Sequence, residues 1–163
     1  MLTEKTAQAL GPFSFYEGCR TLLKAVFLTK EFYNAYVGCS EIEKKETRPY
    51  IRIQVMVDGV LWGIPMRSHI KHDYVLWTDK ENGCGMDFTK AVVIEKPDVY
   101  ISDVQPHIRP EEFKELKRID EYRVAQKLQQ YIKEYKKAKK NLQIPRNKQL
   151  VKFSTLQYFE KFL

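Results

Sequence analysis

The residues best suited to chemistry lie in one short segment, P-M-R-S-H-I-K-H-D, at residues 65–73. Directly after an expected strand it carries a guanidinium, a hydroxyl, two imidazoles and an ammonium, on Arg67, Ser68, His69, His72 and Lys71. Metal-independent cleavage of RNA needs a group that takes the 2′-hydroxyl proton, a group that protonates the 5′-oxygen, and cations beside the phosphorus. These residue types can fill those roles, with Ser68 as a hydrogen-bond donor. The alternative is an ordinary basic loop after a hairpin.

Metal-dependent and hydrolase chemistry fit the same segment less well. His69 and His72 have H-x-x-H spacing, but histidines three apart bind zinc well only from a helix, and the pattern here is typical of strand or loop. The three cysteines, Cys19, Cys39 and Cys84, show no C-x-x-C spacing. No G-x-S-x-G motif surrounds the serine. We therefore expect no metal and no cofactor.

The positive charge of the chain is unevenly distributed. The 163 residues include 28 Lys and Arg against 21 Asp and Glu, and the net charge of +7 falls entirely within residues 111–163, which hold 14 basic and 7 acidic side chains. Such a cationic region favours a polyanionic partner, either nucleic acid or an anionic membrane. No apolar run is long enough to span a bilayer, and the N-terminal residues M-L-T-E-K-T lack the basic and apolar regions of a signal peptide, so we expect a cytoplasmic protein with reduced thiols.

Local patterns in the first 50 residues predict short elements. Residues 3–10 favour a helix, and Ser14 to Glu17 has the capping-box spacing that begins a second one. Residues 24–28 predict a strand. Thr29 is placed to cap a helix that ends at Gly38. The side chains expected on its inner face are Phe32, Tyr33, Tyr36 and Val37. Residues 40–47 are typical of a loop.

The middle of the chain alternates with the period of two that strands require. Residues 50–57 and 60–66 flank Asp58-Gly59, a strong hairpin signal, and Pro65 predicts a strand end or an edge. Further strands are expected at 74–77, 89–95 and 99–102, with a turn at Asn82-Gly83. Arg52 and Gln54 lie on the polar side of the first strand, where they either line an RNA groove or are simply solvated.

Helical periodicity resumes after Pro110 and ends at Pro145, with a slip in phase near Asp120 that allows a break there. Ser154 to Gln157 forms another capping box, which begins a short terminal helix. No linker or repeat divides the chain. We predict a single domain over residues 1–163, of class α+β, with helices around a twisted antiparallel sheet.

Nine Lys or Arg and one acid lie between Lys127 and Lys152. The side chains proposed to bind RNA here are Lys133, Lys136, Lys137, Lys140, Arg146 and Lys148. The alternative, that lysines gather at a helix end to complement its dipole, explains only part of the run. Tyr131 and Tyr135, within it, either stack on unpaired bases or belong to the core. The exposed face lacks the large apolar side chains that membrane insertion needs, so nucleic acid is preferred.

The stretch K-E-T-R-P-Y-I-R-I-Q-V-M-V-D-G-V-L-W-G-I-P-M-R-S-H-I-K-H, followed by G-M-D-F-T-K-A-V-V-I, resembles the ToxN/AbiQ/CptN family. These are endoribonuclease toxins of type III toxin–antitoxin systems. The resemblance extends from about Val26 to the C-terminus, where the F-S-T-L-Q-Y-F-E-K segment closes the chain. It implies that residues 23–163 form the toxin-like core and that residues 1–22 are a helical addition.

The resemblance implies a MazF/Kid-like sheet with a long basic C-terminal helix. It also implies metal-independent, sequence-preferring cleavage of mRNA that leaves 2′,3′-cyclic phosphate and 5′-hydroxyl ends. The implied inhibitor is a small structured RNA, of pseudoknot type, that the toxin cuts from a tandem-repeat precursor and with which it forms a higher-order assembly. Abortive phage defence is the implied setting.

Carried over from the family, Ser68 matches the serine after the I-P strand, Arg48 the basic residue before a small-aromatic pair, and Lys71 one of the basic positions that follow the serine. Arg67 and Arg48 replace a threonine and a lysine. Because arginine stays protonated at ordinary pH, it cannot act as the base. Proton transfer is therefore expected from His69, His72, Lys71 or Lys90, while the two arginines bind the scissile phosphate.

Lys90 follows Asp87 in the G-M-D-F-T-K motif, and the two are expected to pair. Its alternative is an ordinary surface lysine. For the whole chain, the alternative to an endoribonuclease is a non-catalytic RNA-binding module that uses the same groove. A third option is a protein that binds DNA or a membrane surface.

Overall fold

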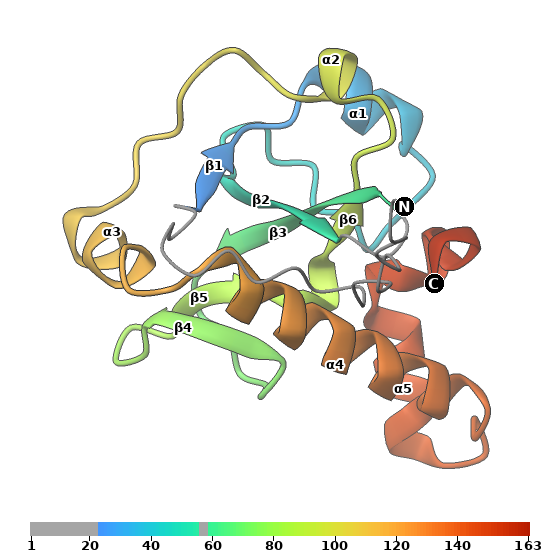
Figure 1. Cartoon of the computed structure of the whole chain (residues 1–163). Coiled ribbons are helices and arrows are strands. Elements are labelled where there is room, and N and C mark those ends of the chain that lie inside the picture. The colour runs from blue at the N-terminus through green and yellow to red at the C-terminus, as the bar shows by residue number, and fades with distance from the viewer. Residues whose placement is uncertain (1–22, 56–58) are drawn as a thin grey trace, which may run out of the picture.

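The computed structural model describes residues 23–55 and 59–163, with the backbone alone for 52–55. Two expected N-terminal helices, the residue Asp58 of the hairpin turn, and the side chains of Arg52 and Gln54 therefore lie outside the described part. Figure 1 shows a twisted sheet flanked by helices, which confirms the α+β class. Within the described ranges, no helix is both long and apolar enough to cross a bilayer.

Every strand pairing in the sheet is antiparallel. The strands are β1 (Lys24–Val26), β2 (Tyr50–Val55), β3 (Val60–Arg67), β4 (Val75–Asp79), β5 (Cys84–Asp87) and β6 (Val92–Val93). Their order is β1-β2-β3-β5-β4, with β6 also beside β3. The predicted hairpin is confirmed, because β2 and β3 pair in register from Tyr50 opposite Pro65 to Val55 opposite Val60.

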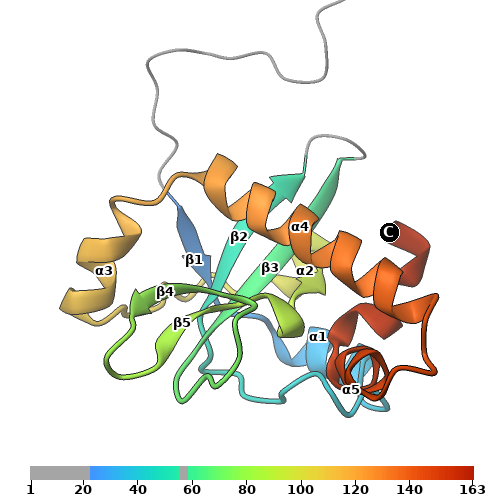
Figure 2. The same ribbon diagram turned by 90° about the horizontal axis from the view of Figure 1, so that it is seen from below.

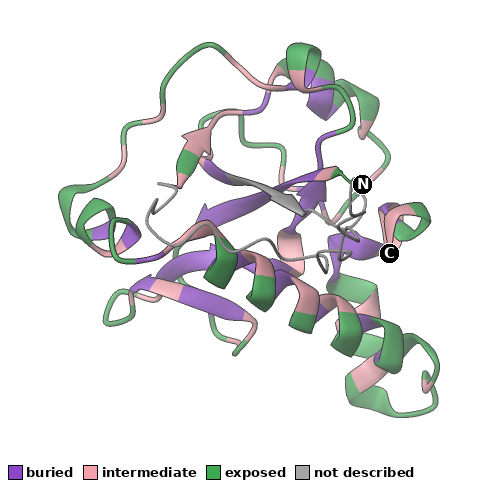
Figure 3. Ribbon diagram, in the orientation of Figure 1, coloured by how far each residue is buried: buried purple, intermediate pink, exposed green. Residues whose placement is uncertain are grey.

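The helices surround this sheet and close the chain. They are α1 (Lys30–Ala35), α2 (Pro97–Tyr100), α3 (Pro110–Leu116), α4 (Glu121–Lys139) and α5 (Pro145–Phe153), together with the 3₁₀ turns η1 (Phe88–Lys90), η2 (Thr155–Tyr158) and η3 (Glu160–Phe162). Figure 2 shows α4 lying across β2 and β3. On its other side α4 is exposed to solvent, as Figure 3 shows.

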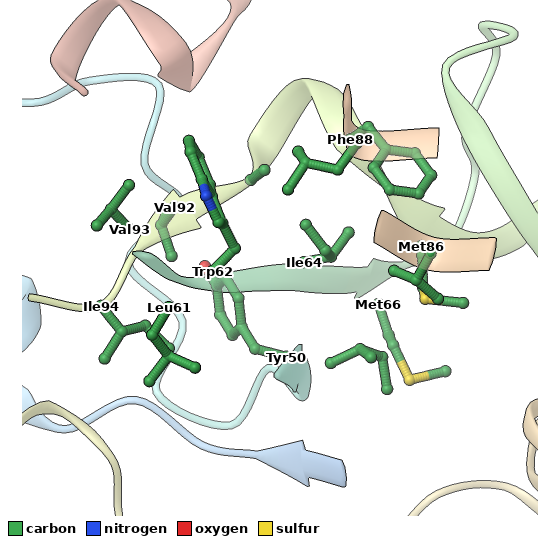
Figure 4. Packing of buried hydrophobic residues seen from close by; sticks show 14 of the residues in the cluster. Tyr50, Leu61, Trp62, Ile64, Met66, Met86, Phe88, Val92, Val93 and Ile94 are labelled. Carbon is green, nitrogen blue, oxygen red and sulfur yellow. The ribbon is translucent and has the colours of Figure 1, made fainter. Parts of the chain in front are cut away.

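The core is centred on β3. All its side chains from Leu61 to Met66 are buried, because neighbouring elements cover both faces of the strand. Figure 4 shows Trp62, Tyr50 and Ile64 packed with residues of β5, η1 and β6. Tyr50, on the same face of β2 as Arg52 and Gln54, is 1% exposed.

Pro65 lies inside β3 rather than at its end, contrary to expectation. The Met66 N–H donates to the Pro49 carbonyl at 2.9 Å, so it points toward β2. Because N–H directions alternate along a strand, the Pro65 nitrogen points to the opposite side. On that side, β6 pairs with residues 62–63 and β5 with residues 66–67. Pro65 lies between these two pairings, so its missing N–H costs the sheet no hydrogen bond.

Capping signals located two helix boundaries correctly. The Thr29 hydroxyl accepts the Phe32 N–H, and Ser154 accepts the Leu156 N–H. Asp120, which had not been predicted as a cap, begins α4 by accepting the Arg123 N–H. Asp120 also marks the break that the slip in phase allowed. Leu156 and Phe159, in the closing turns, are fully buried.

Other expectations were wrong. Val37 is 69% exposed because α1 ends at Ala35, before a further turn could carry that side chain inward. Residues 99–102 do not form a strand: Pro97 occupies the first turn of α2, and only Ile101 bridges to Leu28. The strand expected at 89–95 is reduced to β6, because η1 occupies its first residues. Pro145 begins α5 instead of ending the preceding helix, because proline fits the first turn, where its missing N–H is not needed.

Candidate functional site

A cleft of about 530 Å³ lies at the end of β3. Its walls come from four separate parts of the chain: residues 45–49, the end of β3 with the turn after it, the β4–β5 connection, and residues 107–112. The lining side chains with charge or hydrogen-bonding capacity are Lys45, Thr47, Arg48, Arg67, Ser68, His69, Asn82, Cys84, His107, Arg109 and Glu112. The volume is that of a typical small-ligand site.

Two arginines that are 19 positions apart meet at this cleft through one carboxylate. Arg48 Nη2 donates to Glu43 Oε1 at 2.8 Å, and Arg67 Nε donates to Glu43 Oε2 at 3.1 Å. Arg48 Nη1 also donates to the Met66 carbonyl at 2.9 Å. Both guanidinium groups are thus held in fixed orientations at the cleft wall.

Asp87 anchors the other side of Arg67. Its carboxylate is fully buried and accepts hydrogen bonds from Arg67 Nη1 at 2.6 Å and from the Thr89 hydroxyl at 2.6 Å and backbone N–H at 2.9 Å. Burial alone raises the pKa of Asp87, but hydrogen bonds from His72, Thr89 and Arg67 outweigh it and leave the pKa below its usual value. Burial lowers the pKa of Arg67, but Asp87 and Glu43 raise it more, so Arg67 stays cationic.

His72 belongs to this buried network and not to the cleft lining. Its Nδ1 accepts the Tyr74 N–H at 3.2 Å, so the ring proton lies on Nε2, which contacts Asp87 Oδ1 at 3.2 Å. Lys71, beside it, is exposed. Neither residue lines the cleft.

Lys90 does not pair with Asp87, and that expectation was wrong. Lys90 Nζ donates to Glu41 Oε2 at 2.7 Å and to the Phe153 carbonyl at 2.7 Å. It therefore ties the loop before β2 to the end of α5. Asp87 is already fully engaged by its own neighbours, and the backbone turn at η1 separates the two side chains. Lys90 is also absent from the cleft lining.

Ser68 and His69 project into the cleft from the turn after β3. Ser68 Oγ and His69 Nδ1 are 3.1 Å apart. His69 has a φ of +58°, a left-handed conformation that costs a non-glycine residue of order 1 kcal/mol. Neighbouring contacts enforce it: the Ile70 N–H donates to the Gly83 carbonyl at 3.0 Å, and Ile70 is buried. The imidazole is therefore held at the cleft.

The basic residues predicted to hold RNA lie on α4, on α5 and just after α4. Lys133, Lys136, Lys137, Lys140, Arg146 and Lys148 are all exposed. Tyr131 and Tyr135, at 2% and 0% exposure, belong to the core, which leaves the base-stacking alternative without support. The Tyr131 hydroxyl donates to Ser154 Oγ at 2.8 Å. The basic stretch is thus divided between two helices and a connecting loop.

Seven residues of the cleft with charge or hydrogen-bonding capacity had not been predicted: Lys45, Thr47, Asn82, Cys84, His107, Arg109 and Glu112. Lys45 is positioned through its carbonyl, which accepts the Tyr33 hydroxyl at 3.2 Å; burial raises the pKa of Tyr33 to about 12, so this donor keeps its proton. Arg109 donates to Glu112 at 3.0 Å. The sequence offered one indication that His107 belongs to the site: the chain has only three histidines, and the other two lie in the P-M-R-S-H-I-K-H segment.

Among the residues that the structure describes, no three His, Cys, Asp or Glu side chains gather as metal ligands would. Comparison of the chain with protein-family models, with curated proteins and with solved structures finds no match.

Proposed function

We propose that this protein is a metal-independent endoribonuclease toxin that cleaves mRNA and leaves 2′,3′-cyclic phosphate ends. The observation that carries the proposal is the convergence of Arg48 with the Arg67, Ser68 and His69 segment on one cleft, although Arg48 comes from a separate part of the chain. The proposal includes a MazF/Kid-like fold, with which an antiparallel sheet surrounded by helices is compatible.

The geometry suggests a division of roles. A phosphodiester in the cleft would meet the guanidinium groups of Arg48 and Arg67, which Glu43 keeps pre-oriented so that little reorganisation accompanies the reaction. Ser68 would hydrogen-bond a non-bridging oxygen, and His69 would take the 2′-hydroxyl proton. Lys45 and Arg109 add positive charge to the cleft wall.

The exposed lysines of α4 and α5 are proposed to bind a structured inhibitor RNA. The toxin itself would cut this RNA from a tandem-repeat precursor. Lys136 and Lys137 lie in the last turn of α4, and Arg146 and Lys148 in the first turns of α5. Neutralisation of several RNA phosphates by such a surface supplies sequence-independent affinity. In the proposal, the basic residues of α4 and α5 together take the place of the single long basic C-terminal helix that the resemblance implies.

The test is cleavage of end-labelled RNA by purified protein in excess EDTA. We expect 2′,3′-cyclic phosphate products, a loss of about 10²–10³ in rate for Ser68→Ala, and no loss for the control Ser40→Ala, whose side chain is exposed outside the cleft.

Induced expression should stop growth, and Ser68→Ala or the paired change of His69 and His72 to alanine should relieve the arrest. Normal growth of cells that express the wild-type protein without the inhibitor RNA, with expression confirmed, would refute the proposal that the protein is a toxin.

A second candidate function is RNA binding without cleavage. The observation that favours it is that both arginines of the cleft already have carboxylate partners, Glu43 for Arg48 and both Glu43 and Asp87 for Arg67. Tight binding of structured RNA by the wild-type protein, with no cleavage of any RNA offered, would select this candidate.

A further inference from the structure

The proposed division of roles supplies a base but leaves the departing 5′-oxygen without a proton donor. Arginine is a poor donor because it does not release its proton at ordinary pH, and the ammonium of lysine holds its proton more tightly than an imidazolium does. Glu112, the acidic residue of the cleft lining, is buried and engaged by Thr78 at 2.8 Å and by Arg109 at 3.0 Å, so it is committed to holding α3 against β4. His107 brings to the cleft an imidazole, the side chain that most often serves as a general acid or base.

His107 is held at the cleft by its neighbours in the chain. Ile108 packs against the hydrophobic core, and Arg109 forms ion pairs with Glu112 at 3.0 Å and Asp79 at 3.7 Å. Prolines on both sides of the segment, at positions 106 and 110, restrict the backbone. These anchors hold the segment in place while the imidazole itself stays exposed to solvent and lines the cleft. An exposed side chain on an anchored backbone is well placed to meet a substrate.

His69 reaches the same cleft from a different element, the turn after β3. Its Nδ1 lies 3.1 Å from Ser68 Oγ. If Nδ1 carries the ring proton and donates it to the serine oxygen, Nε2 is left with a lone pair that can accept a proton. In-line cleavage places the attacking and leaving oxygens on opposite sides of phosphorus, so it needs a base and an acid from two different places. The cleft offers two imidazoles from separate parts of the chain, His69 and His107.

We propose that His107 is the general acid of this site and that His69 is its general base. The inference rests on the proposed ribonuclease function. His69 Nε2 takes the proton of the 2′-hydroxyl, whose oxygen forms a bond to phosphorus. The bond from phosphorus to the 5′-oxygen breaks, and protonated His107 supplies the proton that this oxygen needs. The products are a 2′,3′-cyclic phosphate and a 5′-hydroxyl, with one proton taken up by His69 and one released by His107.

The test compares two substrates with the full-length protein. One is ordinary RNA, and the other carries sulfur in place of the bridging 5′-oxygen, so that its leaving thiolate needs no proton. For His107→Ala we expect kcat/KM on ordinary RNA to fall about 10²–10⁴-fold and the loss on the sulfur substrate to be at least about tenfold smaller. His69→Ala should lose activity on both substrates. In a plot of kcat/KM against pH, the decrease at alkaline pH (the alkaline limb) should disappear in His107→Ala, and the decrease at acidic pH (the acidic limb) should disappear in His69→Ala.

Controls separate this inference from the function on which it rests. Val104→Ala changes an exposed side chain of the same segment outside the cleft, and should leave both rates and both limbs unchanged. Binding of a 2′-deoxy analogue, which cannot be cleaved, should be the same for His107→Ala and wild type, which confirms folding. Cleavage by His107→Ala with an unchanged alkaline limb, or an equal loss on both substrates in that variant, would overturn the inference. Absence of cleavage by wild type would instead overturn the proposed function.

Discussion

Among single residues, Asp87 has the densest set of polar contacts at the site. It is fully buried and receives hydrogen bonds from Arg67, His72 and Thr89. A buried carboxylate needs partners of this kind, since an unpaired charge in the interior costs several kcal/mol. Its position fixes the Arg67 guanidinium on one side while Glu43 fixes it on the other. The orientation of the cleft arginine is therefore set by a residue that does not line the cleft.

This dependence predicts a pH-sensitive stability. Because the pKa of Asp87 is lowered in the folded state, its contribution is present above about pH 4, the unfolded value, and is lost as pH falls toward the folded value. Asp87→Asn should reduce the free energy of unfolding at pH 7 by about 1–3 kcal/mol, and the difference from wild type should shrink by about pH 3. Urea titrations at both pH values measure this, with Asp103→Asn, an exposed aspartate, as the control. A difference that stays constant with pH would contradict it.

Among the elements, β5 determines how β3 and β4 are joined beside the cleft. It lies between β3 and β4, with Gly85 opposite both Arg67 and Trp77. A Cβ at Gly85 would lie 2.6 Å from the Leu76 carbonyl oxygen and 2.8 Å from a Val75 methyl. The strand can therefore approach β4 only because residue 85 has no side chain. The same pairing positions the turn that carries Gly83 beside His69.

Substitution at Gly85 should consequently damage the sheet. We expect Gly85→Ala to lower the free energy of unfolding by about 1–3 kcal/mol, because the contact is with backbone, which cannot move aside as a flexible side chain would. Gly38→Ala is the matched control, since nothing lies within 4 Å of a Cβ there, and its effect should stay within about 0.5 kcal/mol. Thermal and urea unfolding monitored by circular dichroism would measure both. Equal stabilities for the two variants would show that β4 and β5 can separate at little cost.

Across the molecule, the residues of the cleft and most of the C-terminal positive charge lie on different elements. The cleft is built from loops around β3, β4 and α3, whereas the exposed lysines of the last 53 residues lie mainly on α4 and α5. Figure 1 shows these helices on the side of the sheet away from α1 and α2. Part of the basic charge is neutralised locally, as in the ion pair between Lys139 and Glu160. The rest is available to an anionic partner.

This arrangement predicts how RNA affinity depends on salt. The double change Lys136→Gln and Lys137→Gln should weaken binding of a structured RNA and reduce the slope of log affinity against log salt by about one unit for each phosphate that the variant no longer neutralises. The control, Lys30→Gln with Lys96→Gln, removes the same charge from exposed positions on α1 and at the start of α2, and should leave the slope near that of wild type. Filter binding across a salt series would measure both slopes. Equal slopes for the two pairs would place the RNA surface elsewhere.

Features that depend on neighbouring residues could be predicted from the amino-acid sequence. The hairpin of β2 and β3, the turn at Gly83, the caps at Thr29 and Ser154 and the break near Asp120 follow from local steric and hydrogen-bonding preferences, and the structure bears them out. The α+β class follows from the change of period along the chain. Pro145 marks the limit of this reasoning, because proline fits both the end of one helix and the start of the next.

Which distant groups meet depends instead on the folded chain. The pairing of Arg67 with Asp87, the ion pair of Lys90 with Glu41 and the position of His107 in the same cleft as the P-M-R-S segment all join residues at least 20 positions apart. Such contacts are set by strand order and by the packing of buried side chains, and they leave no periodic pattern in the sequence. Two tyrosines of α4, at positions 131 and 135, show the same limit, since a tyrosine within a basic helix has the same local sequence whether it faces RNA or the core. The candidate site was therefore predictable in its motif and not in its partners.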